Sequence, residues 1–239
     1  MKTGILATGI TPPELLEQYG SYADMFVALL GNEDPEMTFE IFDVRDDDFP
    51  ASIDSFDAWV ITGSRCGVYD NLPWMQRLSG LIREIYDAGQ PLVGICFGHQ
   101  IVASAFGAKV EKYEAGWGVG LNTYRIEGDW GFLAGDEQDS FTINAMHQDQ
   151  VLELPQNARL FASSEFCRYA GLVYDDRILT LQAHPEFSND YERELVAARR
   201  GPTVPEAVAD EALAGLETGQ QPESERVARW MVKFLKRDY

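Results

Sequence analysis

The chain has no long apolar run. No stretch approaches the roughly 20 apolar residues that a membrane-spanning helix needs. Residues 1–9 have the pattern of a short buried strand and lack the charged and then apolar sequence of a leader. We therefore expect no membrane partner and a cytoplasmic location.

Positive charge is also scarce. The 239 residues include 19 Lys and Arg against 39 Asp and Glu, for a net charge of −20. Such a surface repels phosphate backbones and anionic lipids, which argues against nucleic acid as a partner. The acidity favours high solubility, as in a protein adapted to salt, and a basic partner protein is the alternative.

Only three cysteines are present, Cys66, Cys96 and Cys167. Their odd number, wide spacing and lack of a CxxC pair predict neither a disulfide framework nor a zinc site. We predict no metal and no cofactor, and a catalytic thiol remains open for at least one of the three.

The length permits one full-sized hydrophobic core. We expect a single domain over residues 1–239, with residues 189–239 as its C-terminal helical extension. The first hundred residues alternate between buried strands and amphipathic helices, which predicts right-handed βαβ crossovers and an open, doubly wound α/β sheet. The expected strands are 4–8, 39–44, 58–62 and 91–95, and the expected helices are 15–30, 74–88 and 97–106.

Beyond residue 110 the pattern changes to short alternating strands, which we expect to extend the edge of the sheet in an antiparallel manner. These strands include 118–124, 161–163 and a hairpin, 169–174 with 177–181, that turns at Asp175 and Asp176. The last fifty residues are predicted to be helical in three pieces, separated at 201–205 and 219–222 by Gly and Pro.

The segment Gly94-Ile-Cys-Phe-Gly98 places Cys96 between an expected strand and an expected helix. Glycines on both sides of a nucleophile permit the sharp strand-to-helix turn that exposes it. A helix N-terminus favours a thiolate, and the carboxyl ends of parallel strands are where ligands bind. Cys96 is therefore the candidate nucleophile, and the alternative is a buried free cysteine before a helix cap.

A thiol nucleophile needs a base, and the chain has only three histidines, His99, His147 and His184. In His184-Pro-Glu186 the proline favours an extended conformation for the residue before it, so that the side chains of His184 and Glu186 project to the same side. The carboxylate can then orient the imidazole. Alone, this tripeptide is equally compatible with a capped strand end.

Together, the glycine elbow and the His-Pro-Glu motif resemble the class I, triad-type glutamine amidotransferase family. The resemblance covers residues 4–187, with its motifs at 61–69, 94–100, 145–151 and 182–187, and is nearest to stand-alone members related to the glutaminase domain of GMP synthase. It implies a flavodoxin-like fold.

The family's chemistry carries over to particular residues. Cys96 would attack the side-chain amide of glutamine, His184 would act as base and acid, and Glu186 would orient His184. The resemblance further implies an oxyanion hole from two backbone N–H groups and a pocket for the glutamyl group. The N–H groups are those of Gly63 and Phe97, and the pocket residues are Gln100, Met146 and Gln148.

One position departs from the family pattern. Many relatives have glycine where this chain has Gln148, which places a bulky side chain beside the expected glutamyl pocket. We expect His147 and His99 to be structural, Cys66 to be a loop thiol, and Cys167 to lie in the core.

The resemblance leaves the substrate open between glutamine and another γ-glutamyl small molecule. The first hypothesis is a stand-alone amidotransferase-like enzyme, which either supplies ammonia to a separate synthetase subunit or works as a free γ-glutamyl peptidase or hydrolase. A non-catalytic regulatory subunit with the same fold is the second, although intact Cys96, His184 and Glu186 argue against it. An unrelated doubly wound cysteine hydrolase is disfavoured, because Gln100 also matches the family.

Overall fold

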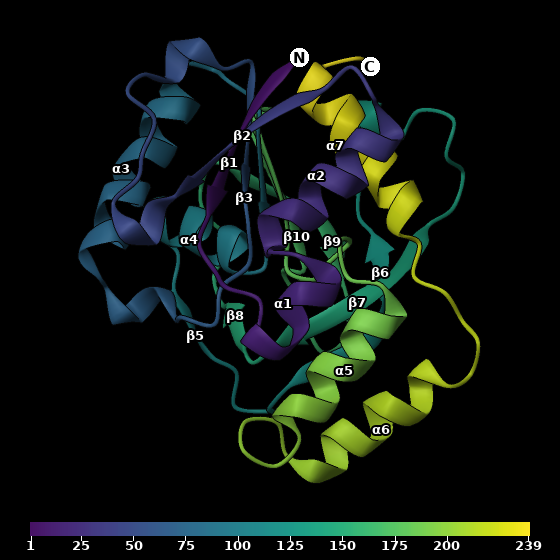
Figure 1. The fold of residues 1–239 in the computed structure, drawn as a ribbon. Coiled ribbons are helices and arrows are strands. Elements are labelled where there is room, and N and C mark those ends of the chain that lie inside the picture. Colours follow the sequence, from purple (N-terminus) through teal and green to yellow (C-terminus); the bar gives the residue numbers. More distant parts are fainter.

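A nine-stranded mixed sheet forms the centre of the molecule in the computed structural model, which describes residues 1–239 (Figure 1). The first five strands in spatial order are parallel, and the other four continue the sheet in antiparallel fashion. In order, they are β2 (Thr38–Asp43), β1 (Lys2–Ala7), β3 (Ala58–Ile61), β4 (Leu92–Ile95), β11 (Ile178–Leu181), β10 (Gly171–Tyr174), β9 (Ala158–Ser163), β6 (Gly118–Ile126) and β7 (Ser140–His147). The predicted doubly wound fold with an antiparallel extension is confirmed.

Helices cover both faces of the sheet, so its central strands are apolar on both sides. Successive residues of β1 illustrate this, because Ile5 contributes to the core on one face and Leu6 to the core on the other. The first core lies beneath α2 (Tyr22–Glu33) and α7 (Ser224–Lys236), and the second beneath α3 (Pro73–Asp87) and α4 (Phe97–Ala105).

The segment predicted as one helix over 15–30 forms two helices, α1 (Pro13–Tyr19) and α2. Gly20 ends the first with a φ of 73°, and Ser21 begins the second as an N-cap whose side chain accepts from the backbone N–H of Asp24. The carboxylate of Asp24 accepts in return from the backbone N–H of Ser21 at 2.8 Å. This capping box makes a new helix start more favourable than a continued turn.

The predicted hairpin turns at Asp175 and Asp176, both of which adopt positive φ, and the N–H of Arg177 closes the turn by donating to the carbonyl of Tyr174 at 2.8 Å. The sequence did not single out β7, because all but its first residue are buried and it therefore lacks the alternation of a half-exposed strand. Two short strands, β5 (Val110–Lys112) and β8 (Asp149–Val151), pair separately from the main sheet.

All three predicted C-terminal helices are present, and they serve different parts of the fold. Helix α7 packs in the first core and is anchored by Arg226, whose guanidinium donates to both carboxylate oxygens of Asp136 at 2.6 and 2.8 Å. Helices α5 (Asn189–Arg199) and α6 (Glu206–Leu216) pack with α1 around a third apolar cluster at one end of the molecule (Figure 1). No helix is long and apolar enough to cross a membrane.

Candidate active site

Cys96 occupies the turn between β4 and α4 with φ 54° and ψ −102°, a conformation that strains a residue other than glycine by about 1–3 kcal/mol. The flanking glycines are needed because the backbone is crowded there. A Cβ at Gly94 would lie 2.8 Å from the carbonyl oxygen of Gly98, and one at Gly98 would lie 2.5 Å from that of Ile61. The expected elbow is thus present, held between β3 and α4.

The Cys96 side chain is nearly buried, and it lies on the wall of a cleft of about 810 Å³. Cys96 is the N-cap residue of α4, so its side chain lies at the end of the helix where the backbone N–H groups are unpaired. The cleft lies at the carboxyl ends of the parallel strands, where this class of sheet binds its ligands.

His184 is held from several directions. Its backbone N–H donates to the carbonyl of Asn144 on β7 at 2.8 Å, and its Nδ1 lies 2.7 Å from a carboxylate oxygen of Glu186. The ring of Phe187 stacks on the imidazole, with centroids 4.0 Å apart and planes 4° apart. These contacts fix the position and the plane of the ring, so that Nδ1 is engaged and Nε2 remains available.

The approach of His184 to Glu186 arises differently from the extended geometry that the sequence suggested. Strand β11 ends at Leu181, and the chain from His184 to Phe187 makes a tight turn in which the N–H of Phe187 donates to the carbonyl of His184 at 3.4 Å. The turn brings the carboxylate back beside the imidazole, and both side chains are buried.

The electrostatics of this group favour a charged imidazole. Burial lowers the pKa of His184, but the charge of Glu186, the charge of Cys96 and hydrogen bonds to both side chains outweigh it and hold the pKa well above its ordinary value. Because Nδ1 is engaged by Glu186, Nε2 is the nitrogen left for the sulfur of Cys96.

Gly63 lies against both of these groups. A Cβ there would be 2.8 Å from Cε1 of His184 and 3.6 Å from Cβ of Cys96, so no larger residue fits without displacing the imidazole. The N–H of Gly63 donates to no group in the protein, and Phe97 is the first residue of α4. Both expected oxyanion-hole residues therefore adjoin Cys96.

The residues expected to hold a glutamyl group also line the cleft, namely Gln100, Met146 and Gln148. The amide of Gln100 donates to the carbonyl of Asp149 at 3.0 Å and to Oε1 of Gln182 at 3.2 Å. Gln148 receives the N–H of Tyr113 on its carbonyl, and its own N–H has no partner in the protein.

The other histidines are buried and uncharged near neutral pH. Burial lowers the pKa of His99 to about 3 and that of His147 to about 4. His99 lies 2.8 Å through Nδ1 from the hydroxyl of Thr180, and His147 lies 3.2 Å from the carbonyl of Asp149. Among the cysteines, Cys66 is half-buried in the cleft wall, and burial in the core raises the pKa of Cys167 to about 12.

Several residues of the site had no distinctive sequence pattern. Phe187 and Asn144 look like ordinary core and strand residues until the fold brings them to His184, and Arg199 reaches the cleft from the end of α5. No group of three His, Cys, Asp or Glu side chains that could hold a metal ion is found.

The family model for class I glutamine amidotransferases matches residues 15–199 of the chain. The chain belongs to this family. It is 32% identical over 210 residues to γ-glutamyl peptidase 3 of Arabidopsis thaliana, an alignment that covers 84% of each chain. It is also 32% identical over 120 residues to the glutamine-hydrolysing GMP synthase subunit of Methanosphaera stadtmanae, covering 48% of this chain and 61% of that relative.

The fold agrees with this membership. A solved glutamine amidotransferase from Thermotoga maritima superposes with a TM-score of 0.73 at 21% identity, covering 99% of this chain and 97% of the other. Similarity at this level of identity establishes the fold alone.

Proposed function

We propose that this class I amidotransferase hydrolyses the side-chain amide of glutamine or of another γ-glutamyl compound through a thioester on Cys96. The observation that carries the proposal is the position of His184. It is aligned by Glu186 at 2.7 Å and by the ring of Phe187, and it lies beside a cysteine at the start of a helix.

The expected reaction begins with an ion pair between the Cys96 thiolate and the His184 imidazolium. The thiolate attacks the amide carbon, and the N–H groups of Gly63 and Phe97 stabilise the oxyanion. The imidazolium then protonates the leaving nitrogen as the C–N bond breaks. Water, deprotonated by His184, attacks the thioester, and glutamate and the free thiol are released.

The test is release of ammonia or amine from glutamine and from γ-glutamyl amides by the purified chain. Cys96→Ser should abolish release, whereas Cys66→Ser, which removes another thiol of the same cleft, should leave most of it. Full activity of the Cys96→Ser variant would refute the mechanism. Absence of activity in the wild-type chain would favour a non-catalytic regulatory subunit.

Two enzymatic roles remain, and the relatives bear on both. Similarity to γ-glutamyl peptidase 3 extends over most of both chains, which favours a peptidase that works alone on a γ-glutamyl compound. Similarity to the glutamine-hydrolysing GMP synthase subunit covers about half of this chain and keeps a separate synthetase as a candidate partner. Rate acceleration on addition of such a synthetase would distinguish the second role.

We also propose that the chain acts as one domain. Helix α7 supplies Val227, Trp230 and Met231 to the same core as β1 and β4, and it therefore supports the sheet that carries Cys96. Deletion of residues 224–239 should unfold the whole chain, whereas an independent extension would leave a folded, active remainder.

A further inference from the structure

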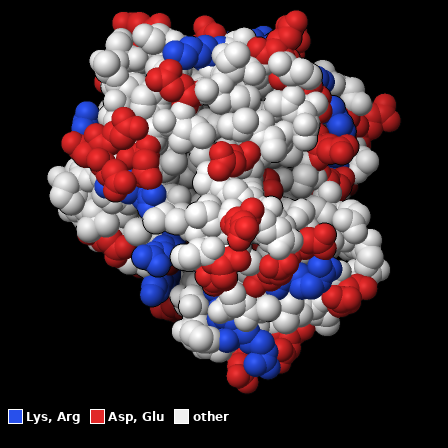
Figure 2. Space-filling view, viewed as in Figure 1, with Lys and Arg blue, Asp and Glu red and all other residues white.

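The cleft contains three unpaired cations in a protein with a large excess of acidic residues. Arg65, Lys112 and Arg199 line it, and none of them forms an ion pair or a side-chain hydrogen bond. Most of the other arginines pair with carboxylates, and acidic side chains outnumber basic ones on the face shown in Figure 2. Basic side chains without partners in such a protein are available to bind an anionic ligand.

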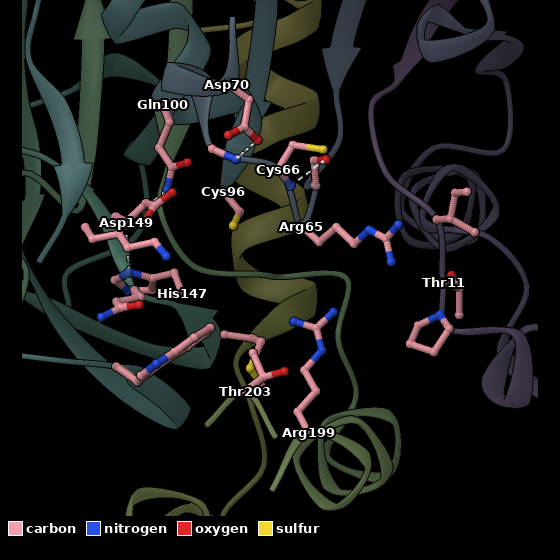
Figure 3. A pocket seen from close by; sticks show the side chains of 18 of the residues that line it. Thr11, Arg65, Cys66, Asp70, Cys96, Gln100, His147, Asp149, Arg199 and Thr203 are labelled. Atoms are coloured by element: carbon pink, nitrogen blue, oxygen red, sulfur yellow. Dashed lines mark hydrogen bonds between the residues drawn. The ribbon is translucent and has the colours of Figure 1, made fainter. Parts of the chain in front are cut away.

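Two of the three come from different walls of the cleft and lie on the same side of Cys96. Arg65 lies in the loop after β3, two residues beyond Gly63, and Arg199 is the last residue of α5. In Figure 3 both side chains lie on the side of Cys96 away from Gln100 and Asp149, with Arg65 extending toward the segment of Thr11 and Arg199 rising from the end of its helix.

Lys112 belongs to the other side. In the backbone register of the two short strands β5 and β8 it lies opposite Asp149, next to Gln148 and close to the expected glutamyl pocket. The cleft therefore has one cation near the glutamyl half of a substrate and a pair of cations across the nucleophile from it.

The acidic residues of the cleft do not neutralise the arginines. Asp70 accepts the backbone N–H of Gly67 at 3.1 Å, and Asp149 accepts the hydroxyl of Tyr69 at 3.3 Å. The third, Glu14, is exposed on α1 and forms no ion pair. The two guanidinium groups therefore keep their charge and their donors for a ligand.

We propose that Arg65 and Arg199 bind a carboxylate on the leaving group, so that the preferred substrates are γ-glutamyl amino acids or short γ-glutamyl peptides. This inference rests on the proposed hydrolysis at Cys96. Glutamine releases ammonia, which would leave this half of the cleft empty, and a cleft of about 810 Å³ exceeds what one amino acid fills. An amino-acid leaving group puts its carboxylate beyond the scissile nitrogen, across Cys96 from the glutamyl half.

The bond changes are those of the proposed reaction. The amide C–N bond breaks as the C–S bond forms, and the His184 proton goes to the departing nitrogen. The carboxylate of the leaving amino acid stays ionised throughout. Arg65 and Arg199 hold the group that departs, and they touch neither the sulfur nor the scissile bond.

Binding and turnover are measured separately, so that the inference and the proposed function can fail independently. The probes are γ-glutamyl-alanine and γ-glutamyl-alaninamide, which have nearly the same shape and differ in the charge of the leaving group. Calorimetry with the inactive Cys96→Ser chain should show binding of the acid roughly tenfold tighter than that of the amide. Added salt should reduce this preference.

The preference should fall toward unity when Arg65→Gln or Arg199→Gln is combined with Cys96→Ser. A general loss of fold would weaken both probes together and leave their ratio unchanged, so the ratio reports on the carboxylate. Arg229→Gln is the matched control, because Arg229 is an exposed, unpaired arginine on α7 and should leave the ratio as it is.

Equal affinity for acid and amide would overturn the inference, even if the wild-type chain hydrolyses both. A preference that persists in both arginine variants would also overturn it, by assigning the carboxylate to another group. A preference that depends on the arginines supports it. If the wild-type chain hydrolysed neither of the two probes nor glutamine, the proposed function would be refuted, and the binding result would be unchanged.

Discussion

Replacing Glu186 by glutamine keeps the size of the side chain and removes the charge beside His184. The carboxylate oxygen lies 2.7 Å from Nδ1, and the side chains of His184 and Glu186 are 5% and 0% exposed, so solvent screens the pair weakly. Two unit charges about 4 Å apart interact by about 4 kcal/mol at the effective dielectric constant suited to protein sites. If that interaction stabilises the imidazolium during the reaction, its loss lowers kcat/KM by about a thousandfold.

The same substitution should be visible as a change in titration. In the wild-type chain His184 has a pKa well above its ordinary value, so it stays protonated through neutral pH and loses its proton as pH rises past that pKa. Without the carboxylate, burial becomes the dominant influence and the pKa falls. Nuclear magnetic resonance can follow this directly, because the other two histidines, His99 and His147, stay neutral near pH 7.

Glu192→Gln is the matched control, since it neutralises another buried carboxyl. Burial raises the pKa of Glu192 to about 7, and one of its oxygens accepts the N–H of Gly120 at 3.1 Å, which a glutamine oxygen can also accept. The Glu192→Gln enzyme should keep a rate within about tenfold of the wild-type rate. A Glu186→Gln enzyme that kept its rate to within tenfold, or a His184 titration that did not move, would contradict the assigned role of Glu186.

Three further predictions concern the surroundings of the site. Gly63→Ala should lower kcat/KM by at least about a hundredfold while the fold melts cooperatively, because its Cβ would push on the imidazole; Gly80→Ala, whose Cβ meets nothing within 4 Å, should leave the rate unchanged. Phe187→Leu should lower kcat by about two- to tenfold with little change in KM, since stacking on the imidazole is worth about 0.5–1.5 kcal/mol, and an equally large rise in KM would count against this role. The pKa values of His99 and His147 lie below the pKa of a histidine in the unfolded chain, so the unfolded chain takes up protons first as the pH falls. The free energy of unfolding should therefore fall as the pH drops from about 6.5 toward 4, by up to about 1.4 kcal/mol per pH unit for each histidine. Urea titrations of His99→Gln should show a free energy of unfolding that depends less steeply on pH.

The parallel half of the fold was predictable because its elements obey local rules. Apolar runs bounded by Gly and Pro marked β3 and β4, and the glycine elbow marked Cys96. The break between α1 and α2 was missed, because the apolar spacing continues through Gly20 and only the capping pair of Ser21 and Asp24 shows where the chain restarts.

The sequence pointed to the candidate reacting groups of the cleft and not to the residues that surround them. Cys96, His184 and Glu186 stand in short motifs whose spacing already suggests their chemistry. Asn144 and Arg199 come from segments outside the candidate motifs at Cys96 and His184, and only the completed sheet and α5 bring Asn144 to His184 and Arg199 to the cleft. No local pattern indicates such long-range placement.

The pairing of β4 with β11 bears on the thermal stability of the site. Cys96 follows one of these strands and His184 lies beyond the end of the other, and the two strands pair in register near the middle of the sheet, with Leu181 opposite Ile95. Because the strands are paired there, the segments that carry Cys96 and His184 are held close together for as long as the centre of the sheet stays folded. The wall formed by the end of α5 and Thr203 lies outside the sheet, so a change in this wall would alter the cleft without disturbing the strands that carry Cys96 and His184.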